Sequence, residues 1–137
     1  MRPGAEAHLE LFAAGRVVIV PAGIGVLGAR RRGGVDTGAR CTTDVRTTEP
    51  TGVVELRPGA RTTVGDLFAV WGRALGRDRL LGFRGPVRAW VGGRRWRGDP
   101  RAIPLRARSQ VVVVTGPAVP VHATYAFPPG GVTHLRP

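Results

Sequence analysis

The segment that decides the fold is TVGDLFAVWG at residues 63–72, the one clear helical pattern in this chain of 137 residues. Thr63 is a good helix N-cap, and Asp66 three residues later gives a near capping box, with Asp in place of the usual Glu. Apolar side chains then recur on one helical face: Val64, Leu67, Phe68, Trp71 and Leu75. Because Gly72 and Gly76 limit its length, the predicted helix is short, about three turns.

Segments on both sides of this helix alternate apolar and polar residues or contain β-branched runs, and both patterns are typical of strands. The expected strands are residues 7–13, 16–20, 40–48, 53–57, 87–91, 94–97 and 110–115. This order of a hairpin, a strand pair, the helix, a second hairpin and a central apolar strand predicts an α+β domain. Its single helix would pack on a mixed, mainly antiparallel β-sheet. By element order, the second half resembles the β-grasp (ubiquitin-like) arrangement.

The length of the chain is enough for one real core, because a chain of this size buries about two-thirds of its unfolded surface. We expect a single α+β domain over residues 1–116, followed by a Pro-rich extended tail over residues 117–137. The charge-free apolar run from Val17 to Ala29 falls short of the ~20 apolar residues of a membrane span. Since the N-terminus has no signal-peptide pattern either, the expected location is the cytoplasm.

Positive charge dominates the composition, with 21 basic residues against 9 acidic ones and a formal net charge of +12. All the basic residues are Arg, whose codons are mostly GC-rich, so part of the excess is expected to reflect a GC-rich genome. The distribution is more informative, because residues 73–108 contain eleven Arg and only two acidic residues, Asp78 and Asp99. A local field of this kind attracts phosphate, acidic protein or an anionic membrane surface.

The second hairpin concentrates this charge. If Gly92-Gly93 closes the turn, Trp90 pairs with Arg95, and one face of the hairpin carries the candidate partner-binding residues: Arg88, Trp90, Arg95 and Arg97. Such a face suits an acidic protein or another polyanion. The alternative is an ordinary solvated surface that binds no partner. Single-stranded nucleic acid is a further alternative, held by stacking and phosphate contacts. It is less favoured because the common RNA-binding signatures are absent. The sequence does not indicate an oligomeric state.

Residues that carry chemistry are few and scattered. Ser109 is the only Ser, Cys41 is the only Cys, and His8, His122 and His134 lack the spacing of a metal site. The sequence therefore predicts no catalytic residues, no cofactor and no enzymatic activity. The alternative that stays open is a degenerate metal-binding protein that uses His8 and Cys41.

A literal Gly-x-Gly-x-x-Gly sequence, GIGVLG at residues 23–28, follows the first predicted hairpin. In a dinucleotide-binding fold these glycines lead into a helix whose N-terminus holds the pyrophosphate. The residues that follow here, ARRRGGVDTG, have no apolar stripe and do not predict such a helix. We therefore expect a glycine-rich turn rather than a nucleotide site.

Several segments together resemble an uncharacterised protein family of high-GC bacteria, over residues 8–128. They are His8-Leu9, VPAGIG at 20–25, Cys41, RTTEPTGVVE at 46–55, TVGDLF at 63–68 with Trp71-Gly72, and GDPRAIPL at 98–105. Similar proteins carry a His-Thr-His-Asp segment where this chain has Arg46-Thr47-Thr48-Glu49, and further His near His8. Clustered His implies a metal site in those proteins, and the resemblance implies its loss here, because Arg46 and Thr48 occupy the His positions. Similar proteins are also exported or membrane-tethered.

Overall fold

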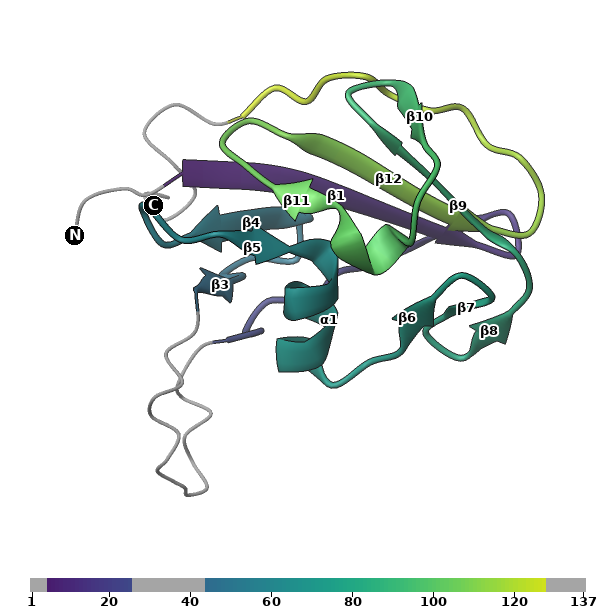
Figure 1. Cartoon of the computed structure of the whole chain (residues 1–137), viewed down its shortest axis with the longest axis horizontal. Coiled ribbons are helices and arrows are strands. Elements are labelled where there is room, and N and C mark those ends of the chain that lie inside the picture. The colour runs from purple at the N-terminus through teal and green to yellow at the C-terminus, as the bar shows by residue number, and fades with distance from the viewer. Residues whose placement is uncertain (1–4, 26–43, 128–137) are drawn as a thin grey trace.

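Two hairpins and a Val-rich strand form most of the main sheet in the computed structural model, which describes residues 5–25 and 44–127 (Figure 1). The first hairpin is β1 (Ala5–Ala13) and β2 (Arg16–Val18), the second is β9 (Val87–Val91) and β10 (Arg94–Trp96), and the Val-rich strand is β12 (Gln110–Thr115). All three elements agree with the sequence patterns. Gly15 closes the first turn with a left-handed φ of 79°.

The main sheet has the order β10-β9-β12-β1-β4-β3, with β2 also paired to β1. Strands β3 (Val45–Arg46) and β4 (Val53–Leu56) complete it on the side of β1 away from β12. β1 and β12 run parallel, with Leu9 beside Val111. The other pairs in this sheet are antiparallel. A mixed, mainly antiparallel sheet with one α-helix in the described residues confirms the predicted α+β class.

Helix α1 (Val64–Trp71) begins where the sequence predicts. The Thr63 hydroxyl accepts a hydrogen bond from the Asp66 N–H at 3.1 Å, and the Asp66 carboxylate accepts one from the Thr63 N–H at 2.9 Å. These two bonds complete the capping box. The prediction of about three turns that reach Leu75 was wrong. The helix has 8 residues and ends at Gly72, whose φ of 83° turns the chain away, so that Leu75 lies in a strand instead.

Short strands surround the helix at positions that the alternation patterns do not predict. They are β5 (Thr62–Thr63) paired with β11 (Pro104–Leu105), and an antiparallel sheet of β6 (Leu75–Gly76), β7 (Arg79–Leu80) and β8 (Phe83–Arg84). A 3-10 helix at Pro100–Ala102 lies against α1. Their contact is close because Gly65 has no side chain, and a Cβ there would lie 2.8 Å from the Arg101 carbonyl oxygen.

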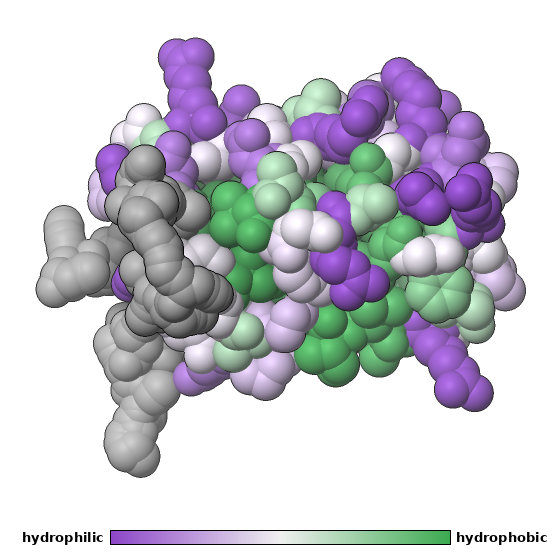
Figure 2. All heavy atoms as spheres, turned by 90° about the horizontal axis from the view of Figure 1, so that it is seen from below, coloured by the Kyte–Doolittle hydropathy of each residue, from purple (hydrophilic) through white to green (hydrophobic). Residues whose placement is uncertain are grey.

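The core lies between one face of the main sheet and α1, which covers that face from below in Figure 1. Alternate residues of the two central strands point into it, and they meet the apolar stripe of the helix: Ala7, Leu9, Leu11, Val111 and Val113 with Val64, Leu67 and Phe68. Figure 2 shows the molecule from this lower side, where hydrophobic residues lie between hydrophilic ones. The intervening residues of β1 and β12 face away from the helix, on what we call the outer face.

The C-terminal segment, residues 117–127, covers part of the outer face. It contains no helix or strand and runs back over the sheet on the side opposite α1 (Figure 1). Its path follows Gly116, whose carbonyl accepts a hydrogen bond from Arg88, and passes the β9–β10 turn, where Ala123 lies against Gly93. Within the described residues, no helix is long and apolar enough to cross a membrane.

Candidate functional site

The β9–β10 hairpin adopts the pairing that its two-glycine turn predicts. Val91 lies opposite Arg94, Trp90 opposite Arg95 and Ala89 opposite Trp96. Gly92 and Gly93 both have positive φ, 59° and 84°, as a tight two-residue turn requires. The predicted register is therefore confirmed, while the role of the face that it creates stays a prediction.

Trp90 and Arg95 form the centre of this face. Trp90 is half-buried beside Val112 of β12, and the guanidinium carbon of Arg95 lies 5.4 Å from the centroid of the Trp90 ring system. A cation over an aromatic ring at an exposed site contributes about 0.5–1 kcal/mol. The contact also restricts the long Arg95 side chain, which reduces the entropy that it would lose on binding an anion.

The other two predicted residues extend the face in different ways. Arg88 is half-buried, and its guanidinium donates a hydrogen bond to the carbonyl of Gly116. Arg97 is exposed directly after β10. Trp96 points to the opposite side, packs against the core and donates from Nε1 to the carbonyl of Asp99 at 3.0 Å. The hairpin therefore separates a core face from a cationic face.

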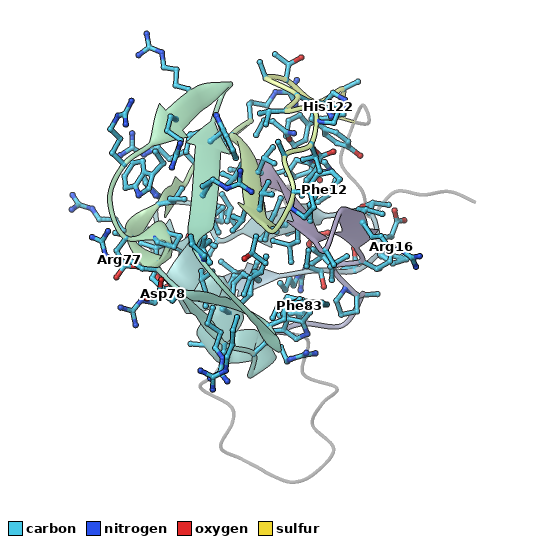
Figure 3. The ribbon with its side chains drawn as sticks, turned by 90° about the vertical axis from the view of Figure 1, so that its right-hand side faces the viewer. Phe12, Arg16, Arg77, Asp78, Phe83 and His122 are labelled. Atoms are coloured by element: carbon cyan, nitrogen blue, oxygen red, sulfur yellow. The ribbon has the colours of Figure 1, made fainter. Side chains whose placement is uncertain are left out.

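Carboxylates are scarce around the cationic face. In the part of the chain that the structure describes, the Arg–carboxylate ion pairs are Arg46–Glu55, Arg57–Asp44 and Arg101–Asp99. None of them involves Arg88, Arg95 or Arg97, so these three charges have no carboxylate partner among the described residues. The Arg101–Asp99 pair is the tightest at 2.7 Å, and its hydrogen bonds lower the pKa of Asp99 to about 2. Figure 3 labels two further exposed arginines, Arg16 and Arg77.

A second polar centre lies on the outer face of the sheet around His8, which is 4% exposed. Its Nδ1 is 2.6 Å from Gln110 Oε1, and its Nε2 is 3.0 Å from the carbonyl oxygen of Thr51. Gln110 donates from Nε2 to Glu10 Oε1 at 3.2 Å, and Nδ1 of His122 is 3.4 Å from the same carboxylate oxygen. We call His8, Gln110 and Glu10 the His8 centre.

Tyr125 of the C-terminal segment covers the His8 centre. The Tyr125 and His8 rings are stacked, with centroids 3.5 Å apart and planes 7° from parallel. Phe127 packs edge-on against Tyr125, and Arg108 lies 4.8 Å over the Phe127 ring. Burial raises the pKa of Tyr125, and the nearby carboxylates of Glu6, Glu10 and Glu49 raise it further. The segment is therefore attached to the sheet through aromatic contacts.

Sequence reasoning considered His8 only as a metal ligand and did not find Gln110 or Tyr125. One signal was available, because strand alternation places Glu6, His8 and Glu10 on one side of β1. The partners of His8 could not be found in this way, since Gln110 lies 102 positions away along the chain.

The residues of the metal-binding alternative are not brought together in the described part of the chain. Cys41 lies outside the described residues. Within residues 5–25 and 44–127, no group of three His, Cys, Asp or Glu side chains is placed to hold a metal ion. Arg46 and Thr48, which the resemblance expected from the sequence would put at His positions, both bind Glu55. Arg46 Nε donates to Glu55 Oε1 at 2.9 Å and the Thr48 hydroxyl donates to Oε2 at 3.1 Å.

The glycine sequence that follows β2 begins in a turn. Gly23 and Gly25 have φ values of 92° and 74°. The N–H of Gly23 donates to the Thr47 carbonyl at 2.8 Å, and the N–H of Ile24 donates to the Thr47 hydroxyl at 3.1 Å. These N–H groups, which a bound phosphate would require, are therefore used within the fold. Residues 26–28 of the motif lie outside the described residues.

Comparisons of this chain with protein-family models, curated proteins and solved structures find no match. Its function must therefore be inferred from its own surfaces, of which the cationic hairpin face and the His8 centre are the most developed.

Proposed function

We propose that this protein is a non-enzymatic binding module that holds an acidic protein on the β9–β10 hairpin, through Arg88, Trp90, Arg95 and Arg97. The observation that carries the proposal is the Arg95–Trp90 contact at 5.4 Å, on a face whose arginines have no carboxylate partner among the described residues. A charged face without counter-charges from its own chain suits an external anion.

An acidic protein fits this face for two physical reasons. A guanidinium group binds a carboxylate through two parallel hydrogen bonds, which gives direction as well as attraction. Trp and Arg are also typical anchor residues of protein interfaces. A nucleic-acid base would instead need an open aromatic ring to stack on. Arg95 already lies over the ring of Trp90, so that face of the ring is not open to a base.

We also propose that the module has a β-grasp-like architecture. The strand order β2-β1-β12-β9-β10, with β1 and β12 parallel at its centre, supports this assignment. The position of α1 in the chain, between the two hairpins, supports it as well. β3 and β4 would then be additions beside β1, and the cationic hairpin would form the opposite end of the sheet.

The test compares two charge-reversal variants of the full chain with the same net charge. Arg95→Glu/Arg97→Glu changes the proposed face, and Arg16→Glu/Arg61→Glu changes two exposed arginines elsewhere. Each protein is titrated into a fluorescein-labelled oligoglutamate peptide and into a labelled oligo-dT strand. Fluorescence anisotropy then gives the dissociation constants at several salt concentrations, and circular dichroism checks the folding of each variant.

The proposal expects the hairpin variant alone to bind the peptide about tenfold more weakly or worse. Equal losses in both variants would overturn it, because binding would then follow net charge rather than a site. Failure of the unmodified chain to bind the peptide would overturn it as well. Tighter binding to oligo-dT, with a log–log salt slope of about −0.7 per phosphate, would replace the acidic protein with single-stranded nucleic acid.

A further inference from the structure

The C-terminal segment lies directly on the His8 centre. Tyr125 stacks on His8, and His122 lies 3.4 Å from the carboxylate of Glu10. Figure 3 shows His122 on this segment, above the sheet. Val112 and Val114 of β12 are at most 1% exposed, although they alternate with the residues that face the core. The fit of the segment therefore depends on the state of the groups beneath it.

One nitrogen of the His8 ring must carry a proton. Nε2 is 3.0 Å from the Thr51 carbonyl oxygen, and a carbonyl oxygen can only accept a hydrogen bond. If the imidazole is neutral, its single proton is used at this position. The other nitrogen, Nδ1, is then an acceptor.

Nδ1, however, also faces an oxygen, because Gln110 Oε1 lies 2.6 Å from it. The amide cannot simply be turned over. Its NH₂ end donates to Glu10 at 3.2 Å, and a reversed amide would place its oxygen against that carboxylate, which would then need a proton itself. In both arrangements the His8 centre holds one proton more than a neutral His8 and an ionised Glu10 have together.

We propose that this one proton docks the C-terminal segment, and that its loss as the pH rises releases the segment from the sheet. With the proton bound, each contact in the centre is a hydrogen bond, and a positive imidazolium ring can lie against the face of Tyr125. Without it, two acceptors face each other in a buried site, which is costly. In the proposal, His8 and Gln110 then turn, and this removes the surface on which Tyr125 stacks.

Charged and titratable groups from several elements surround the centre. The groups that face it or its cover are Glu6 and Glu10 of β1, Glu49 of the loop before β4, Tyr125 and His122 of the segment, and Arg108 next to Phe127. Because docking needs the bound proton, the proposal expects docking at low pH and its loss as the pH rises.

The test follows protonation and docking together in the full chain, by NMR between about pH 5 and pH 9. The ¹⁵N shifts of the His8 ring report its protonation, and the nuclear Overhauser effects between the Tyr125 and His8 rings report docking. We expect these effects to disappear with the same midpoint at which the centre loses its proton. Docking that stays constant through that midpoint, or a centre that releases no proton in this range while the segment is docked, would overturn the proposal.

Two variants separate the buried centre from the exposed ion pair. Gln110→Met keeps the size of the side chain but cannot link His8 to Glu10, and we expect docking to lose its pH dependence. His122→Ala removes the exposed histidine, and we expect the pH dependence to persist. Loss of the dependence in His122→Ala would assign it to the exposed pair and overturn the proposal. This second variant changes an exposed side chain, so the test holds even if Gln110→Met does not fold.

Discussion

Tyr125 and His8 stack face to face, with ring centroids 3.5 Å apart, and so join the C-terminal segment to the first strand of the sheet. The ring of Tyr125 rests on a histidine that is itself held at both nitrogens. Aromatic pairs of this kind contribute about 0.5–1.5 kcal/mol beyond the area that they bury. The contact therefore makes the segment part of the folded structure.

Removal of this ring is expected to lower the free energy of unfolding. Tyr125→Ala should cost about 1–3 kcal/mol in urea unfolding, because the stack and part of the cover over the outer face are lost. Tyr125→Phe keeps the ring and should remain within about 0.5 kcal/mol of the unmodified chain. Equal losses in the two variants would show that the hydroxyl, rather than the stack, stabilises the segment.

Gly52 and Gly59 offer a matched pair, because their φ values are nearly the same, 84° and 82°. At Gly59 an added Cβ would meet nothing within 4 Å, so Gly59→Ala should cost only the left-handed penalty of about 1–2 kcal/mol. At Gly52 it would lie 2.5 Å from the Leu9 carbonyl oxygen and 3.0 Å from His8 Nε2. Gly52→Ala should therefore lose about 1–3 kcal/mol more in urea unfolding. Similar values for both variants would contradict the close contact with β1.

Thr63 stabilises the start of α1 through its hydroxyl, which accepts a hydrogen bond from the N–H of Asp66. Thr63→Ala should therefore lower the free energy of unfolding by about 1 kcal/mol. Thr63→Ser keeps the oxygen and should recover most of that loss. Urea unfolding followed by circular dichroism measures both, and a serine variant as unstable as the alanine variant would show that the methyl group is what matters.

Asp99 makes stability depend on pH at the acidic end. Hydrogen bonds from Arg101 lower its pKa from the ordinary 3.8 to about 2 in the folded chain. A lowered carboxyl pKa stabilises the fold above the ordinary value, and this contribution is lost as the pH falls through about 2. As the pH falls from 3.8 to about 2, the free energy of unfolding of Asp99→Asn should therefore decrease less than that of the unmodified chain. Urea unfolding at several pH values measures this difference. Arg101→Gln removes the side-chain hydrogen bonds, which are the largest cause, and keeps the backbone hydrogen bond of residue 101, so it should weaken the acid dependence in the same direction. An unchanged acid dependence in Arg101→Gln would contradict the assignment.

The local sequence pattern was sufficient to predict those features whose cause lies within a few residues. Thr63 and Asp66 form their capping box because the spacing of three suits the first turn of a helix. A two-residue turn leaves one register for the strands that it joins, so the pairing of Trp90 with Arg95 could be predicted. The candidate face of the hairpin follows from that register.

The sequence pattern could not predict strands that are too short to show an alternation of apolar and polar residues. The β6–β8 sheet is made of two-residue strands, and alternation cannot be detected over such lengths. Leu75 fits the helical stripe by spacing, yet it lies in β6, because the chain leaves the helix at Gly72. The spacing of apolar residues alone does not show that the chain changes direction between two of them.

The sequence by itself determined both hairpins, the start of the helix and the cationic face between Arg88 and Arg97. Only the tertiary structure decided that β1 lies beside β12, that His8 meets Gln110 across 102 positions, and that Tyr125 closes over them. The physical reason is that turns and caps are set by neighbouring residues, whereas these contacts close long loops and form only when distant segments bury a shared surface.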